Sequence, residues 1–236
     1  MRRFFVFCGL LAIVWWSIGA FRARGNTPWA RLDSGIERRT FLWHGVQVHA
    51  FRADASRVFL GIGETLDALD WLKFKRARVA INGGYFDEKG KPLGLRVSQK
   101  RKKVALREAN WGVFWIRKGR ARIAHTRDFS TKHKTDEAIQ CGPRLVVAGR
   151  ATDLKPQWSR RSGIGIDNRG RVVLAVADGP LSLQDWAGAF ASNDGLGCRD
   201  ALNLDGGPST QMAFQTSNKR GQVDGGWPVP DAILIR

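Results

Sequence analysis

The chain has 236 residues and a mass of 26.3 kDa, which suits one ordinary domain. Apolar residues make up 43% and charged residues 25%, which excludes a disordered chain, and the single long apolar run excludes a polytopic membrane protein. The 39 Lys and Arg residues against 21 Asp and Glu residues give a net charge of +18, an unusually basic balance.

The N-terminus carries the features of an export segment. Arg2 and Arg3 precede an uncharged apolar run over residues 4–21. The run is long for a signal peptide and at the lower limit for a membrane-spanning helix. Residues 1–24 are therefore predicted to be a cleaved signal or a retained anchor in the inner membrane. In both cases the rest of the chain is expected in the periplasm or cell envelope.

Short strand patterns separated by turn residues follow. Residues 25–39 are expected to hold a linker, up to about residue 32, and the first strand, and residues 40–236 to form the domain. A helix is predicted over 65–72, capped by Thr65, and a second one from Ser182 to about residue 192, opened by a Ser182–Asp185 capping box. Hairpins are predicted across Lys118-Gly119 and across residues 168–170. Further strands are expected at 36–43, 46–51, 58–62, 78–82, 145–148, 201–204 and 232–235. The absence of regular βαβ alternation indicates a single α+β domain with a mixed β-sheet core and two or three flanking helices.

Two cysteines remain after the leader, Cys141 and Cys198. An even pair in an oxidising compartment predicts a disulfide, and two buried free thiols are the alternative. The chain has no C-x-x-C motif and its four His residues show no zinc-ligand spacing, so no metal site of the His/Cys type is expected.

Four glycine-rich or polar segments lie directly against apolar strands. They are Asn82-Gly83-Gly84-Tyr85-Phe86-Asp87, Cys141-Gly142-Pro143-Arg144, Arg161-Ser162-Gly163-Ile164-Gly165 and residues 203–210, Asn-Leu-Asp-Gly-Gly-Pro-Ser-Thr. Taken singly, each is explained by a turn or a surface cation. Together, glycines that let the backbone approach a ligand and arginines that match phosphate oxygens predict a site for an anionic, oxygen-rich ligand.

These segments, in this order and with Asp178-Gly179, resemble the phosphodiester glycosidase family, which includes the catalytic domain of N-acetylglucosamine-1-phosphodiester α-N-acetylglucosaminidase. The resemblance covers roughly residues 40–236 and implies an exported hydrolase that cleaves sugar-1-phosphodiesters of envelope or extracellular glycoconjugates. Two residues depart from the family pattern: Pro208 replaces a third glycine, and Ser162 stands where Thr is more usual. Proline removes one N–H that could bind phosphate.

The resemblance and the residue chemistry together suggest roles. Asp205 is the first candidate for a nucleophile or water-activating base, Asp178 is the second, and Asp87 is a weaker one. Asn82 is expected to bind a sugar hydroxyl or to orient a carboxylate. The expected phosphate- and substrate-binding groups are Arg144, Arg161, Ser162, Gly83, Gly84, Asn203, Gly206, Gly207 and Ser209. No cofactor is demanded, and a divalent cation held by Asp and Asn oxygens is compatible with these residues.

A basic stretch over residues 96–107 supports a different class of function, a non-catalytic envelope protein that binds an anionic polysaccharide or a phosphate-linked polymer. Export and the weak interleaving of aromatic with basic residues argue against nucleic acid. The stretch is expected to be an exposed loop or hairpin that attracts anionic substrate from a distance. Replacing Asp205 separates the two classes, because only an enzyme would lose turnover.

Overall fold

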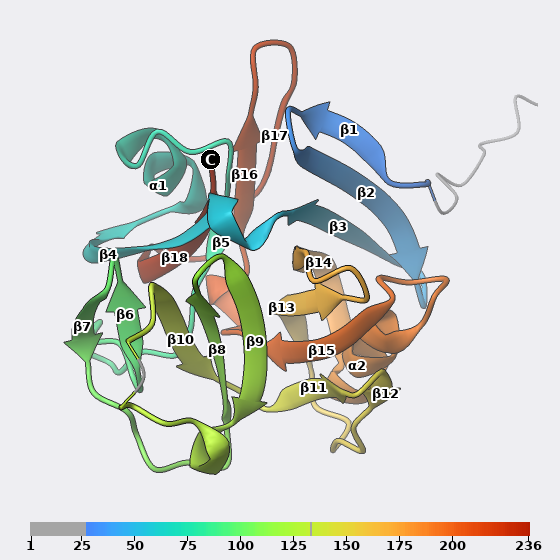
Figure 1. Cartoon of the computed structure of the whole chain (residues 1–236). Coiled ribbons are helices and arrows are strands. Elements are labelled where there is room, and N and C mark those ends of the chain that lie inside the picture. Colours follow the sequence, from blue (N-terminus) through green and yellow to red (C-terminus); the bar gives the residue numbers. More distant parts are fainter. Residues whose placement is uncertain (1–26, 133) are drawn as a thin grey trace, which may run out of the picture.

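The structure is a computed structural model and describes residues 27–132 and 134–236. These residues form a single domain rich in β-structure, with three sheets and two α-helices on their outer sides (Figure 1). The predicted mixed sheet is wrong, because every strand pair in the described residues is antiparallel. The predicted signal or anchor at residues 1–24 lies outside the described residues. Within them, no helix has the length and apolar character to cross a membrane.

The largest sheet has eight strands in the order β1-β2-β3-β14-β13-β15-β11-β12. Their bounds are Ala30–Asp33 (β1), Ile36–Trp43 (β2), Val46–Ala53 (β3), Arg144–Val147 (β11), Arg150–Ala151 (β12), Trp158–Asp167 (β13), Val172–Ser182 (β14) and Cys198–Asn203 (β15). Strand β1 pairs with β2, so the sheet begins within the segment predicted to be a linker. The predicted hairpin at residues 168–170 is confirmed, since it joins β13 to β14.

Two five-stranded sheets complete the domain. The order β7-β6-β10-β8-β9 comprises Arg96–Ser98 (β6), Arg101–Val104 (β7), Gly112–Arg117 (β8), Arg120–His125 (β9) and Glu137–Cys141 (β10). The order β17-β16-β5-β18-β4 comprises Val58–Leu66 (β4), Val79–Asn82 (β5), Met212–Gln215 (β16), Arg220–Val223 (β17) and Val229–Ile235 (β18). Lys118 and Gly119 both have positive φ angles, 51° and 70°, and form the predicted tight turn between β8 and β9. Three short 3₁₀ helices cover Ala55–Arg57 (η1), Thr126–Asp128 (η2) and Gly207–Ser209 (η3).

The main core lies where one face of each sheet meets the other two. It includes Ile164, Phe114 and Ile233, one from each sheet. The opposite face of the large sheet packs against helix α2, Leu183–Ala191. Gly163 permits this packing, since a Cβ there would lie 2.8 Å from the Phe190 ring.

The two helices begin at different kinds of cap. Helix α2 starts as predicted: the Ser182 hydroxyl accepts a hydrogen bond from the Asp185 amide at 3.0 Å. Helix α1 spans Ala68–Phe74 and is capped by Asp67, whose carboxylate accepts from the Asp70 amide at 2.8 Å. The predicted start at Thr65 is wrong, because β4 continues to Leu66 in pairing with β18.

The predicted disulfide is also wrong, since both cysteines are free and buried. Cys141 belongs to the main core, whereas Cys198 packs on the helix face of the large sheet. The sheet therefore separates the two thiols. Burial raises the pKa of the Cys141 thiol to about 12 and raises that of Cys198 as well, so both remain protonated and unreactive.

Candidate active site

The candidate site forms where the end of β15 meets the end of β5. The Asn82 side-chain amide donates to the Asp205 carbonyl at 2.8 Å, and the Asp205 amide donates to the Gly83 carbonyl at 3.1 Å. These bonds join the large sheet to the third sheet. Two segments far apart in the sequence, the first and fourth glycine-rich segments, therefore lie side by side.

Asn82 and Ser162 are fully buried and act as a cross-link behind the site. The Asn82 Oδ1 atom accepts from the Ser162 hydroxyl at 2.7 Å and from the Gln211 amide at 3.2 Å. The two side chains bind protein groups and present no exposed surface to a ligand. They fix the backbone that carries Asp205.

The Asp205 carboxylate is the titratable group at the centre of this junction. Its Oδ1 atom accepts from the Gly206 amide at 3.0 Å, and the Ser209 hydroxyl also hydrogen-bonds to it. Burial raises the pKa of Asp205, and this effect outweighs the lowering by the two hydrogen bonds. A carboxyl group that is only partly exposed and has a raised pKa is suited to proton transfer or nucleophilic attack.

Tyr85 joins the segments around Asp205, although sequence analysis assigned it no role. Its hydroxyl donates to the Gly142 carbonyl and accepts from the Asn203 side-chain amide at 3.3 Å. Burial raises the pKa of Tyr85, and the charges of both Asp205 and Arg161 act on the hydroxyl. The signal available in the sequence was that the only tyrosine of the chain stands within the first glycine-rich segment.

Asn203 presents an acceptor without a donor. Its amide nitrogen donates to the Gly142 carbonyl at 3.0 Å and to the Leu204 carbonyl at 2.7 Å. The Oδ1 atom is buried and has no hydrogen-bond partner within the described residues. A buried oxygen without a donor is costly, so a ligand hydroxyl or a water molecule is the expected partner.

The two predicted phosphate-binding arginines lie in different surroundings. The Arg161 guanidinium is largely buried, donates to the carbonyls of Leu181 (3.1 Å) and Gln157, and has no carboxylate partner in the part of the chain that is described. Burial lowers its pKa, yet an arginine remains charged. Arg144 is partly exposed, and its charge acts on His125, whose pKa is lowered first by burial and further by Arg127 and Arg144.

Gly83 and Gly84 serve the fold rather than a ligand. Their amides donate to the Asp231 carbonyl and to its Oδ1 atom, each at 2.9 Å, so the predicted phosphate contacts of these amides are already occupied. A Cβ at Gly83 would lie 1.7 Å from Asp231 Oδ1, and one at Gly84 would lie 2.5 Å from Arg96 Nη2. The glycines thus admit a buried ion pair, Arg96 Nε to Asp231 Oδ2 at 2.8 Å, that sequence analysis did not find.

The segment after Asp205 contacts the side chain of Trp227, which lies at the edge of the candidate site. Gly207 has φ +59°, and a Cβ at Gly206 would lie 2.7 Å from the Arg160 carbonyl, so both positions require glycine. The Ser209 hydroxyl that contacts Asp205 also accepts from Trp227 Nε1 at 3.2 Å. The Trp227 side chain is 51% exposed, which leaves an indole face free beside the carboxylate.

The other two acidic candidates lie in different settings. Asp178 is exposed and forms an ion pair with Arg160 at 3.3 Å. Asp87 stabilises a turn, because its Oδ1 atom accepts from the amides of Lys89 at 3.0 Å and Lys91 at 2.8 Å. Among the described residues, no group of three or more His, Cys, Asp or Glu residues could hold a metal ion.

Comparisons with known proteins give a match to one family and to individual proteins. A model of the phosphodiester glycosidase family matches residues 75–236, which include β5, β15 and the junction between them. The uncharacterised protein YigE of Escherichia coli (strain K12) is 30% identical over 144 residues, a stretch that spans 56% of each protein.

Two solved structures share the fold. The catalytic domain of zebrafish N-acetylglucosamine-1-phosphodiester α-N-acetylglucosaminidase superposes with a TM-score of 0.68 at 17% identity, covering 89% of this chain and 86% of that domain. A hypothetical protein from Synechocystis gives a TM-score of 0.60 at 16% identity, covering 89% of this chain and 64% of that protein.

Proposed function

Because this chain belongs to the phosphodiester glycosidase family, we propose that it is an exported hydrolase that cleaves the bond between a sugar and a phosphodiester. The observation that carries the proposal is the partly buried Asp205 carboxylate at the junction of β5 and β15, where its pKa is raised. The charges of Asp205 and of Arg161, which has no carboxylate partner among the described residues, both act on Tyr85. A carboxylate and a cation at one site match the two charges that develop when such a bond breaks.

In the proposed reaction, Asp205 and Arg161 have separate roles. The bond from the anomeric carbon to the bridging phosphate oxygen breaks, and the oxygen of water ends on that carbon. Asp205 acts as the nucleophile or as the base that activates water. Arg161 would stabilise the charge on the departing phosphate, because a guanidinium has five N–H donors and two of them bind carbonyls here.

The rim contacts would hold the sugar. The exposed indole of Trp227 provides a flat apolar face of the kind that packs against a sugar ring, and it is linked to Asp205 through Ser209. The unsatisfied Asn203 Oδ1 atom is positioned to accept a hydrogen bond from a sugar hydroxyl. Strand β11 begins at Arg144 and pairs with β15 next to this junction, and we expect the arginine to add positive charge for the phosphate.

The test is the turnover of Asp205→Asn on a panel of sugar-1-phosphodiesters, beginning with an N-acetylglucosamine-1-phosphodiester. Removing the charge while keeping the size should lower kcat at least ~100-fold, since a positioned acid or base contributes about that much. Asp178→Asn is the matched control, because it removes an exposed carboxylate and should leave kcat within about threefold. Loss of activity in Asp178→Asn alone would transfer the catalytic role to that residue.

Two further outcomes bear on the proposal. If no sugar-1-phosphodiester is cleaved and Asp205→Asn binds anionic polymers as well as the wild type, the protein is a binding module instead.

For export, a reporter that is active only outside the cytoplasm, fused after residue 30, should be active. Activity only of a cytoplasmic reporter would refute that part.

A further inference from the structure

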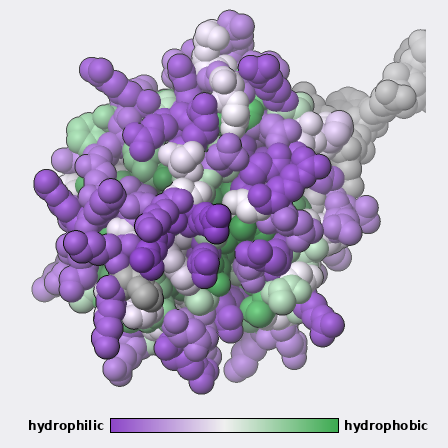
Figure 2. Space-filling view, viewed as in Figure 1, coloured by the Kyte–Doolittle hydropathy of each residue, from purple (hydrophilic) through white to green (hydrophobic). Residues whose placement is uncertain are grey.

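Basic side chains gather on the outer face of the five-stranded sheet β7-β6-β10-β8-β9. Two hollows there, of about 640 and 240 Å³, share Phe129 as a lining residue. One acidic and eight basic side chains line them, and all eight basic ones are exposed. We call these eight the basic face: Lys100, Lys102, Arg117, Lys118, Arg120, Arg122, Lys132 and Lys134. Figure 2 shows hydrophilic side chains over this part of the molecule.

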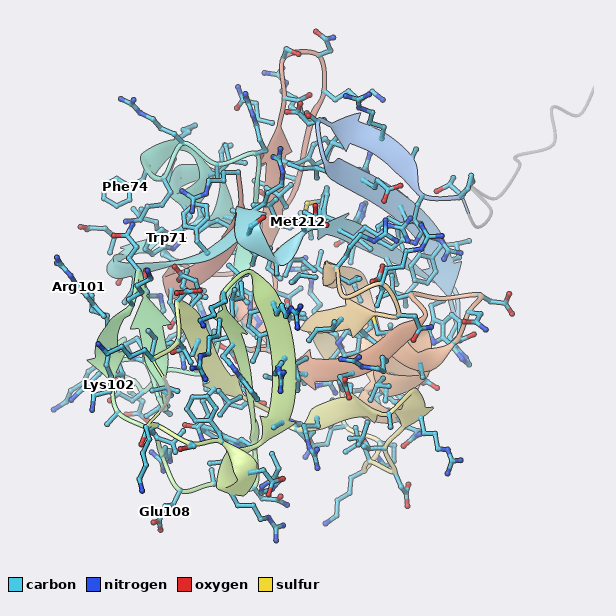
Figure 3. All side chains as sticks on the ribbon, viewed as in Figure 1. Trp71, Phe74, Arg101, Lys102, Glu108 and Met212 are labelled. Atoms are coloured by element: carbon cyan, nitrogen blue, oxygen red, sulfur yellow. The ribbon has the colours of Figure 1, made fainter. Side chains whose placement is uncertain are left out.

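Strand alternation places the charges together. In β9, Ala121 packs into the main core, whereas Arg120 and Arg122 are exposed on the other side. At the opposite edge of the sheet, Arg101 and Lys102 of β7 extend away from the molecule (Figure 3). The four strand spacings between these edges correspond to about 19 Å. A ligand that contacts both edges is therefore longer than one sugar unit.

The charges of the basic face are almost unpaired within the described residues. Of the eight, Lys100 has an acidic partner, Asp136, at 3.9 Å. The sequence prediction of an exposed basic hairpin is confirmed for β6 and β7, except at Arg96, which is buried in its pair with Asp231. Like charges held on one face repel each other, and a bound polyanion would relieve that repulsion.

Two aromatic side chains lie beneath the charged side chains and line the hollows. Trp115 and Phe129 are partly buried and pack edge to face with ring centroids 5.1 Å apart. The large apolar side chains that the described residues expose, Phe74, Trp158 and Trp227, lie elsewhere, so the basic face has nothing to insert into a bilayer. With volumes of about 640 and 240 Å³, the hollows have the size of pockets that hold small ligands, so each can hold a short part of a single chain.

We infer that the basic face binds a linear acidic polysaccharide, whose carboxylate or phosphate groups contact the arginines and lysines while sugar faces rest on Trp115 and Phe129. The inference does not depend on catalysis at Asp205.

The test is binding of polygalacturonate, with neutral dextran of equal length as the control ligand. The variant K102Q/R120Q/R122Q/K132Q removes four charges from the basic face. The control variant K73Q/R76Q/K219Q/R220Q removes four exposed charges, two in or just after α1 and two at the start of β17 or just before it. At about 50 mM salt the first should bind at least ~10-fold more weakly than wild type and show a shallower salt dependence, whereas the control stays within about twofold.

Three outcomes would overturn the inference. Equal weakening in both variants would show attraction by net charge alone. Equal binding of dextran would show that the anionic groups are not recognised. Tighter binding of a DNA duplex or of phosphatidylglycerol vesicles through the same four residues would assign the basic face to a different partner. Unfolding temperatures of both variants near that of wild type would confirm that the comparison concerns binding.

Discussion

Asp231→Asn should destabilise the protein strongly, because it leaves the Arg96 guanidinium charged and without a counter-charge. Both side chains are almost completely buried, at 0% and 1% exposure, and their closest atoms are 2.8 Å apart. The substitution keeps the size of the side chain, so the effect reports charge and not volume. The pair also holds the site in place, since Arg96 Nη2 donates to the Tyr85 carbonyl at 3.2 Å.

The size of the effect follows from the burial. Removing one partner of a buried ion pair costs about 3–5 kcal/mol, a large part of the ~5–15 kcal/mol that stabilises a typical domain. For a chain of this length, each kcal/mol lowers Tm by about 2–4 °C. Asp231→Asn should therefore lower Tm by roughly 6–20 °C.

The assay is urea and thermal unfolding followed by tryptophan fluorescence. Asp178→Asn is again the matched control, because it breaks an ion pair with side chains 28% and 48% exposed and should cost less than about 1 kcal/mol. Adding Arg96→Met to Asp231→Asn should cost less than the sum of the single variants, with a coupling energy of at least about 1 kcal/mol. Equal costs for Asp231→Asn and Asp178→Asn, or strict additivity in the double variant, would refute the reasoning.

Three further predictions concern the site and the thiols. Because the pKa of Asp205 is raised, kcat/KM should fall on the acid side with an apparent pKa above the ordinary aspartate value of about 3.9. Burial penalises only the charged form, so the wild type should lose stability relative to Asp205→Asn as pH rises through that range. Coincident pH profiles of stability for the two proteins would contradict this. Cys141 and Cys198 should resist alkylation in the native protein and should both react after unfolding without reductant. If neither cysteine is labelled in the unfolded, unreduced protein, the two thiols are joined in a disulfide. Tyr85→Phe should cost about 1–2 kcal/mol and lower kcat, because the Gly142 carbonyl and the Asn203 side-chain amide each lose their hydrogen bond to the hydroxyl; unchanged kcat would remove Tyr85 from the site.

Local features of the fold could be predicted because their causes are local. The turn at Lys118-Gly119 and the cap at Ser182 depend on residues within one turn of each other. The start of α1 could not be predicted in this way. Thr65 has the chemistry of a cap, but β4 pairs with β18, more than 150 positions along the sequence, and this pairing keeps Thr65 in a strand.

The site was partly predictable for the same reason. Asp205 and Asp178 look alike in the sequence, since each ends an apolar run and precedes glycine. They differ because β15 ends at Asn203 against the third sheet, whereas β14 continues past Asp178 to Ser182. The burial of Arg96 could not be predicted for the same reason. Arg96 begins a basic stretch in the sequence, and its side chain is buried because it pairs with the distant Asp231.

The double glycines of the first and fourth glycine-rich segments have different structural roles. Gly83 and Gly84 allow Asp231 and Arg96 to approach the backbone, and their amides are used there. Gly206, by contrast, donates its amide to Asp205 itself. An alanine at Gly83 should therefore act on stability, because its Cβ would overlap a buried carboxylate, whereas the chemistry depends on the segment that follows β15. This difference explains why glycine is needed at both motifs although only one surrounds the proposed catalytic group.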